Sequence, residues 1–449
     1  MIPILTYYLS TEEYGILSLI FTLILFTNSI ITLEVSQAVS VYFPLSKESE
    51  RKIYPSTALK LLLFVYIIFI VIILILSNFI LEKFIKNEIS NSIIIASSLL
   101  MATNGIFLII QNQFRLEFNS RNFAIISIAY ILLTSTGTLM GILYFNAGIK
   151  GVIWGQMIGT AIVSIFGLYI QFTSFNQNFR YTILIKMLKY SVPLVPAVLL
   201  QIGSQQIPKF ILSMYSNLEE VGIYGLAYQI ASFSALAVIG VQTALTPSIL
   251  ANYKEIETPK MLAKLFERFA TFALILCAFL SIFSSEIISL FSNSAYQKSE
   301  RLVPFLSFAI ALNCFYIFFP GKLIFNKSGF QLIASASSFI VATVMGILLT
   351  KIDGSRGAAL ATLISSLIFF SVWCHSSQRL YPLIINWYDL CFSAILVGLV
   401  CYITNSELFI VVGIYSIFLK ILIFILLVFL ISKKYLIELK LLYLNRINL

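Results

Sequence analysis

The sequence predicts an all-α polytopic membrane protein, built from two tandem six-helix bundles and two further C-terminal helices. Of its 449 residues, 59% are hydrophobic and only 11% are charged, whereas a soluble domain carries about a quarter charged residues. Apolar runs long enough to cross a bilayer recur along the whole chain. An internal repeat then divides these runs into two related halves.

The repeat is clearest in two short polar hairpins. Residues 4–16 read ILTYYLSTEEYGI and residues 211–223 read ILSMYSNLEEVGI, with seven identical positions in thirteen at an offset of 207. Downstream, the glycine-bounded segments at 148–151 and 354–357 match at nearly the same offset. A fixed offset over this length indicates duplication in tandem.

Each membrane-spanning run must satisfy its own backbone hydrogen bonds, so we expect helices throughout. The predicted spans are 14–35, 58–81, 92–112, 123–145 and 152–172 in the first half, 188–215, 221–244, 269–291, 303–325, 330–350 and 358–373 in the second, and then 387–403 and 408–431. Residues 1–9 are the tail of a first helix, because nine residues at 1.5 Å each do not cross a core of ~30 Å. We therefore expect a truncated first helix, an N-terminal bundle at 1–172, a C-terminal bundle at 188–373 and two additional helices at 387–431.

The positive charge is distributed as in membrane proteins. The net charge is +10, and 19 of the 29 lysines and arginines fall in loops on one predicted side against 7 on the other. This bias places the 19 in the cytoplasm and gives no basis for nucleic-acid binding. An even number of spans per half makes the repeat parallel, which favours a substrate site between the halves.

Enzyme and cofactor signals are weak. The pairs Glu12-Glu13 and Glu219-Glu220 begin helices, where acids suit the positive end of the dipole. His375 is the only histidine, and the five cysteines lie in or beside apolar runs without metal spacing. We expect no enzyme, no metal and no cofactor, and no nucleotide-binding loop is visible.

Three motifs give a family resemblance. YYLSTEEYG at residues 7–15, EEVGIY at 219–224 and YSVPLVP at 190–196 resemble the signatures of the bacterial polysaccharide (O-antigen type) flippases of the MOP superfamily, which are related to MATE exporters. The resemblance covers essentially the whole chain. It implies a multi-pass protein of the bacterial inner membrane that moves a polyprenyl-pyrophosphate-linked oligosaccharide for O-antigen or capsule synthesis, alongside a polysaccharide polymerase and a chain-length regulator. Two departures concern charge: Pro208-Lys209 stands where the family often has an acid before the cation, and Glu34 and Gln37 stand where it often has an arginine.

Lys209 is the leading candidate for substrate contact. A charge deep in a span costs at least ~2.5 kcal/mol unless it faces a wet cavity or a partner. Gln201, Gln205 and Lys209 are spaced to share one helix face, and Pro208 is expected to kink the helix or free a carbonyl. The functional interpretation is contact with pyrophosphate or sugar. The alternatives are a lysine paired inside the bundle or one that snorkels to the interface.

Further charges flank the predicted spans. The repeat-related Arg115 and Lys322 are candidates to receive a phosphate, or are ordinary cytoplasmic anchors. Glu34 is a candidate for proton or ion coupling, either alone or paired with Lys60, Arg115 or Lys322, or is a helix-end acid in water. Lys420 in the last helix is predicted to snorkel into lipid or to contact another subunit.

Two other functions fit part of the pattern. A membrane glycan polymerase or ligase has a similar helix count but typically needs a long outer loop with arginines and acids, and the longest outer connections here are residues 78–91 and 292–302. A MATE-like drug exporter is expected to line its spans with acids for cationic drugs, and few acids occur here.

Overall fold

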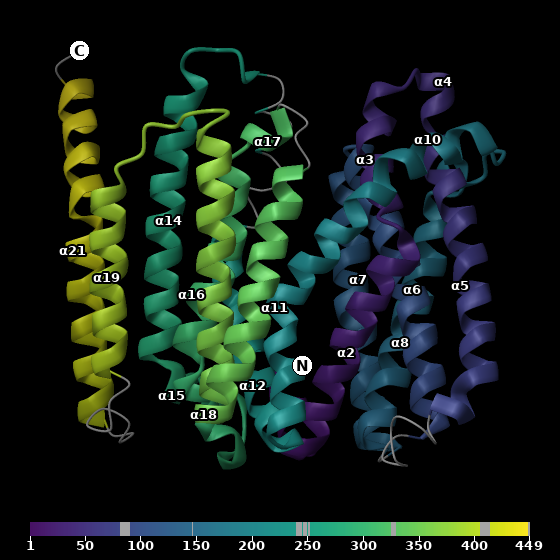
Figure 1. Ribbon diagram of the computed structural model, residues 1–449, viewed down its shortest axis with the longest axis horizontal. Coiled ribbons are helices and arrows are strands. Elements are labelled where there is room, and N and C mark those ends of the chain that lie inside the picture. The colour runs from purple at the N-terminus through teal and green to yellow at the C-terminus, as the bar shows by residue number, and fades with distance from the viewer. Residues whose placement is uncertain are drawn as a thin grey trace. The chain divides into compact units, whose positions relative to one another are not determined.

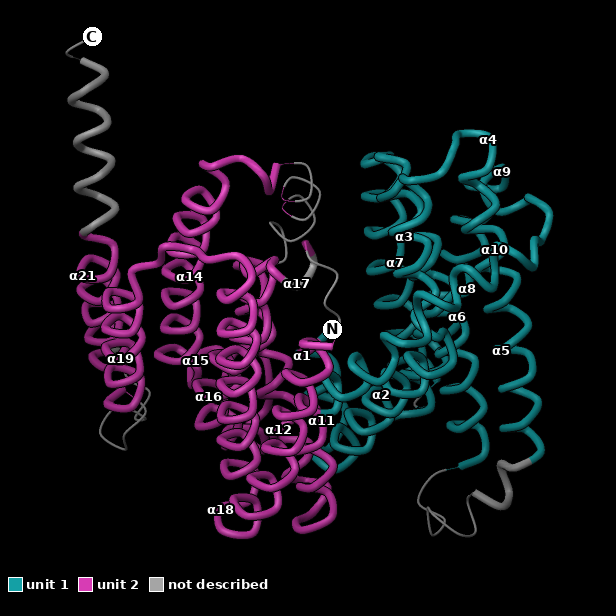
Figure 2. Tube along the Cα trace, turned by 45° about the horizontal axis from the view of Figure 1, so that its top comes forward, with its two compact units in different colours: residues 1, 3–203 teal, residues 2, 204–449 magenta. Residues whose placement is uncertain are grey.

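The structure is a computed structural model that describes residues 1–80, 90–145, 147–238, 245, 249, 252–324, 329–404 and 414–447. The chain forms two compact units, residues 3–203 with Met1 and residues 204–449 with Ile2 (Figure 2). Their boundary falls inside one helix, α11 (Val195–Tyr215). The domain limits expected from the sequence stay a prediction.

Unit 1 consists of helices joined by short connections (Figure 1). Its elements are α1 (Ile2–Tyr8), α2 (Thr11–Thr32), α3 (Val35–Leu45), α4 (Glu48–Arg51), α5 (Ile53–Ile80), α6 (Asn91–Leu116), α7 (Ser120–Leu139), the π-helical turn η2 (Met140–Tyr144), α8 (Gly148–Ile170), α9 (Phe172–Phe175), α10 (Tyr181–Ser191) and the 3₁₀ turn η3 (Val192–Leu194). The start of α11 completes the unit.

Unit 2 continues from α11 and is also helical. Its elements are α12 (Leu218–Ala231), η4 (Ser232–Ala235), α14 (Thr258–Ile282), α15 (Ser284–Phe291), η5 (Ser294–Arg301), α16 (Val303–Cys314), η6 (Phe315–Phe318), α17 (Gly321–Ile324), α18 (Gly329–Gln378), α19 (Trp387–Thr404) and α21 (Ile414–Ile447).

The predicted class is confirmed: this is a multi-pass, all-helical membrane protein. In the described residues, 11 helices are long and apolar enough to cross a membrane, or 12 if one bent pair is a single span. The 50-residue α18 is interrupted at Asp353 and Gly354, where the backbone is not helical. The interruption lies between the predicted spans 330–350 and 358–373.

Both acidic hairpins start helices, as the sequence predicts. Ser10 and Glu13 form a reciprocal capping box at the start of α2, with each side chain bonded to the other's backbone N–H. At the start of α12, the Asn217 side chain accepts from the backbone N–H of Glu220. The carboxylate of Glu220 instead accepts a 2.8 Å hydrogen bond from the backbone N–H of Ser355.

Each unit packs one of these glutamates against a glycine with positive φ. In unit 1, Glu13 Oε1 lies 3.4 Å from the place of a Cβ on Gly148, whose φ is +52°. In unit 2, Glu220 Oε2 lies 3.0 Å from the corresponding place on Gly354, whose φ is +46°. Both glycines precede a helical segment, and both pairs fall at the repeat spacing found in the sequence.

Glycines bring α7 and the following turn η2 into backbone contact with α8. A Cβ on Gly155 would lie 2.2 Å from the carbonyl oxygen of Gly137, and one on Gly151 would lie 2.4 Å from that of Gly141. These spacings of four residues are the small-xxx-small pattern of closely packed membrane helices. Side chains at these positions would force the two helices apart.

Helix α2 ends at an unusual joint. Leu33 and Glu34 both have positive φ, 47° and 53°, and α3 begins at the next residue. The sequence predicts one span over 14–35, whereas the structure has α2, this joint and then α3. The left-handed conformation costs about 1–2 kcal/mol for each residue with a Cβ, so surrounding packing holds the joint.

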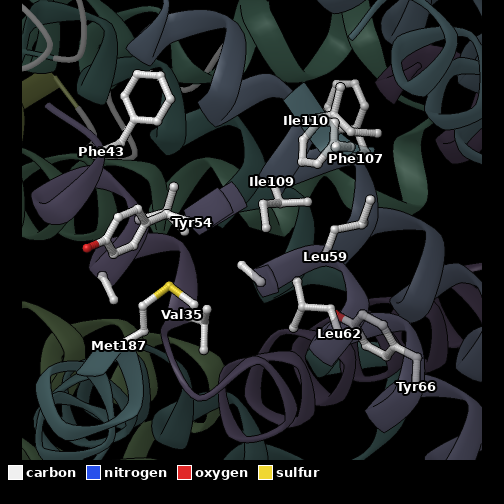
Figure 3. Packing of buried hydrophobic residues seen from close by; sticks show 14 of the residues in the cluster. Val35, Phe43, Tyr54, Leu59, Leu62, Tyr66, Phe107, Ile109, Ile110 and Met187 are labelled. Atoms are coloured by element: carbon white, nitrogen blue, oxygen red, sulfur yellow. The ribbon is translucent and has the colours of Figure 1, made fainter. Parts of the chain in front are cut away.

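The apolar core of unit 1 supplies the packing that keeps Leu33 and Glu34 in this conformation. Val35, Tyr54 and Met187, from α3, α5 and α10, are buried in one cluster with Leu62 and Ile110 (Figure 3). Each buried side chain makes many dispersion contacts, and such close packing is what holds helices together inside a membrane. The start of α3 is therefore fixed by three elements that are distant in sequence.

The two C-terminal helices dock on unit 2 through a small core and one ion pair. Ala278 and Ile282 of α14 pack with Val397 of α19 and Leu427 of α21. Lys420 is 2% exposed, and its Nζ lies 2.8 Å from Glu286 Oε1. The prediction that Lys420 snorkels or contacts another subunit was wrong, because α21 turns this side chain towards the carboxylate of α15.

Candidate functional site

Lys209 is buried inside unit 2, on α11. It is 5% exposed, and its Nζ lies 5.6 Å from the centre of the Tyr228 ring on α12. The face of an aromatic ring attracts a cation, and the attraction is strongest where water is excluded. Lys209 therefore neither snorkels nor faces lipid, and its role in substrate contact stays a prediction.

Tyr228 belongs to a short polar chain that links α11, α12 and α18. Gln206 Nε2 donates to the Tyr228 hydroxyl at 3.3 Å, and the Tyr228 ring stacks on Tyr224 at 6.4 Å between centroids. The Tyr224 hydroxyl is 2.8 Å from Thr362 Oγ1. Three elements, α11, α12 and α18, thus fix the surroundings of Lys209.

Pro208 acts on the helix as predicted. Proline has no N–H to donate to the residue four before it, and the carbonyl oxygen of Ser204 instead lies 3.4 Å from the donating Ser365 Oγ. Gly346 of α18 packs next to this point, where a Cβ would lie 3.8 Å from the Cα of Pro208. The freed Ser204 carbonyl therefore faces a hydroxyl of α18, which also donates to the Thr362 carbonyl oxygen at 2.9 Å.

The other predicted members of the Lys209 face lie on the same helix. Gln205 is half-buried and belongs to unit 2, whereas Gln201 is half-buried and belongs to unit 1. All three positions lie within α11 at intervals of four residues. Their joint contact with a ligand stays a prediction.

In unit 1, Arg115 lies at the exposed end of α6 and bonds to its neighbour Asn112 at 2.5 Å. Asn112 Nδ2 in turn donates to Ser40 Oγ at 3.0 Å and to the backbone oxygen of Ser36 at 3.4 Å. A polar network thus joins the ends of α3 and α6.

Glu34 lies just before this network, at the joint. It accepts a 2.8 Å hydrogen bond from Gln37 Nε2 and a bond from Ser29. Of its expected partners, Lys60 donates to the backbone oxygen of Gln177 at 2.5 Å and Arg115 bonds to Asn112. Glu34 is therefore held by neutral donors within its own segment, and the expected pairs with Lys60 and Arg115 are not formed.

Lys322 lies in α17 of unit 2. Its side chain is outside the described part of the structure, so its predicted phosphate contact stays a prediction. Among the described residues, no group of three or more His, Cys, Asp or Glu side chains could hold a metal ion.

One cluster at the end of unit 1 was missed by the sequence analysis. We name Lys186, Tyr42, Tyr54 and Tyr190 the tyrosine–lysine cluster. Lys186 Nζ lies 4.5 Å from the Tyr42 ring centre and 3.4 Å from the Tyr54 hydroxyl. Tyr42 stacks on Tyr54 at 5.8 Å and meets Tyr190 edge-on at 5.8 Å. The only sequence signal was the spacing of Lys186 and Tyr190, one helical turn apart on α10.

Several proteins of known structure share the fold of this chain. Solved structures with the same fold include the lipid II flippase MurJ in an inward closed conformation, with a TM-score of 0.73 and 15% identity over 98% of this chain and 96% of that one. An inward-facing MATE multidrug transporter of the MOP superfamily has a TM-score of 0.64 and 14% identity over 84% and 93%. A MOP superfamily transporter from Pyrococcus furiosus, described as having a binding pocket of reverse polarity, has a TM-score of 0.60 and 15% identity over 82% and 87%.

The fold is therefore that of MOP superfamily transporters. Residues 4–301 match the model of the polysaccharide biosynthesis protein family, and the chain belongs to that family. No curated protein matches the sequence.

Proposed function

We propose that this protein is a flippase that moves a polyprenyl-pyrophosphate-linked oligosaccharide repeat unit across the bacterial cytoplasmic membrane. The product would feed O-antigen or capsule synthesis, with a polysaccharide polymerase and a chain-length regulator as partners. Membership of the polysaccharide biosynthesis protein family is the observation that carries the proposal. The transporter fold supports translocation in place of catalysis.

The extent of the structural matches favours lipid-linked cargo over drugs. The match to the lipid II flippase covers 98% of this chain, whereas the match to the MATE transporter covers 84%. Helices α19 and α21 lie within residues 387–449, after the two predicted bundles. These helices are docked to unit 2 by a core and a buried ion pair, so they are an integral part of the molecule.

Transport would proceed by alternating access of two duplicated halves. The Glu13–Gly148 and Glu220–Gly354 pairs support the duplication, because each half uses the same two residue types at nearly the same spacing. Lys209, Gln205, Gln201, Arg115 and Lys322 are the proposed substrate contacts, and Glu34 is the proposed coupling residue. The energy would come from an ion gradient or from consumption of the product.

Deletion of the gene tests the proposal directly. We expect surface polysaccharide to be lost while lipid-linked repeat units accumulate on the cytoplasmic side. Single units that reach the outer leaflet without being polymerised would instead identify a polymerase. Normal polysaccharide with increased drug sensitivity would identify an exporter.

A further inference from the structure

The tyrosine–lysine cluster holds a cation in a fixed orientation at an accessible place. Lys186 is exposed, Tyr42 and Tyr190 are half-buried, and Tyr54 is buried. The ammonium lies over the Tyr42 ring and donates to the Tyr54 hydroxyl, which accounts for one of its three donors. The remaining donors are available to a ligand, and the two rings restrict the freedom of a long side chain.

The acids near this end of unit 1 are engaged elsewhere. Glu48 pairs with Arg51 at 3.1 Å and Glu50 pairs with Arg180 at 3.2 Å. Within the described ranges, no carboxylate lies at ion-pair distance from Lys186. The cluster therefore presents a net positive charge that protein groups do not neutralise.

A second cation lies over an aromatic ring of α3, the helix that carries Tyr42. The Arg51 guanidinium is 5.7 Å from the centre of the Phe43 ring, and its Nε is buried without a hydrogen-bond partner among the described residues. Phe43 is the neighbour of Tyr42 on α3. Two oriented cations thus flank the end of α3 that the charge distribution predicts to be cytoplasmic.

We propose that the tyrosine–lysine cluster is a receiving site for the phosphorylated sugar head of the lipid-linked substrate. The Lys186 ammonium would bind a phosphate oxygen by a charge-assisted hydrogen bond. The half-buried Tyr42 and Tyr190 rings meet at a corner, where the apolar face of a sugar can pack and its hydroxyls can reach the phenols. This inference rests on the proposed function and adds a binding site outside the Lys209 region.

The test uses the full-length protein in nanodiscs of phosphatidylcholine. The probes are a polyprenyl pyrophosphate and the same lipid carrying one sugar, with the dissociation constants measured by microscale thermophoresis. Lys186→Gln should weaken binding of both probes by about tenfold or more, the loss expected for one charge-assisted hydrogen bond. Tyr190→Leu, which leaves the Tyr42 and Tyr54 rings beside Lys186 in place, should remove only the additional affinity conferred by the sugar.

The matched control is Lys189→Gln, which removes the same charge one turn further along α10. It should change either constant by less than about twofold, and Lys186→Arg, which keeps the charge, should bind within a few-fold of wild type. Equal losses in Lys186→Gln and Lys189→Gln would mean unspecific attraction and would overturn the proposal. Wild-type affinity in a folded Lys186→Gln would also overturn it.

A further experiment distinguishes binding of the substrate from binding of bilayer lipids, whose headgroups also carry a phosphate. Nanodiscs with phosphatidylglycerol should leave the affinity ratio of wild type to Lys186→Gln unchanged. Collapse of that ratio would assign the cluster to bilayer headgroups and would overturn the substrate site. If Lys186→Gln binds and flips like wild type, this inference fails while the proposed function stands; if wild type binds neither probe, both fail.

Discussion

Lys420 and Glu286 form an ion pair inside unit 2, with 2.8 Å between Nζ and Oε1 and side-chain exposures of 3% and 19%. The pair joins α21, one of the two C-terminal helices, to α15. The desolvation of two charges offsets much of their attraction, but loss of one partner leaves the other buried and uncompensated.

Lys420→Met should therefore lower the free energy of unfolding by about 3–5 kcal/mol. The double variant Lys420→Met, Glu286→Leu should recover most of that loss, because no lone charge remains. The measurement is a double-mutant cycle from denaturant unfolding in detergent, with Lys433→Met, an exposed lysine of the same helix, as the control. A double variant as unstable as the single one would contradict the explanation.

Gly354→Ala should destabilise the protein by about 1–3 kcal/mol, because Gly354 has φ +46° and ψ −128°, a conformation that only glycine adopts easily. The new methyl would also press on Glu220, 3.0 Å away. Gly329→Ala is the matched control in the same helix, since a Cβ there meets nothing within 4 Å. The measurement is the shift in melting temperature, which should be larger for Gly354→Ala than for Gly329→Ala. Equal shifts in the two variants would refute the strain argument.

Gly155→Val should prevent α7 and α8 from packing, because even the Cβ would lie 2.2 Å from a backbone oxygen that cannot yield. Overpacking typically costs about 1–3 kcal/mol and more where backbone must move, so we expect a sharp fall in folded protein after purification. Gly398→Val adds the same volume at a site with nothing within 4 Å and should give a normal monodisperse peak by size-exclusion chromatography. A well-folded Gly155→Val would show that the helices tolerate separation.

Lys209→Gln should reduce transport at least tenfold at a normal level of membrane protein, if the buried cation contributes a charge-assisted contact of about 1.5–3 kcal/mol to the substrate. Tyr228→Phe keeps the ring under the cation and removes only the hydroxyl that accepts from Gln206, so it should retain most of the activity. Accumulation of lipid-linked units on the cytoplasmic side is the readout. Full transport by Lys209→Gln would remove this residue from the site.

The helical class, most of the spans and both helix starts could be predicted from the sequence because they depend on local rules, whereas the predicted spans 14–35 and 269–291 are each divided in the structure. Apolar length predicts a span, and Ser10 and Glu13 are a capping box within four residues. The partner of Lys420 was not readable, since Glu286 is 134 positions away and only packing selects it. The tyrosine–lysine cluster was missed for the same reason: α3, α5 and α10 each supply one or two members, and no single segment shows the pattern.

The joint at Leu33 and Glu34 has a mechanical consequence. A continuous helix bends sharply only where its ladder of backbone hydrogen bonds is interrupted, and here the α2 pattern already stops before α3 begins. Tilting α3 about that point would leave the ladders of both segments intact. Because the buried Val35, Tyr54 and Met187 side chains hold the start of α3, any such tilt would have to carry the packed parts of α5 and α10 with it.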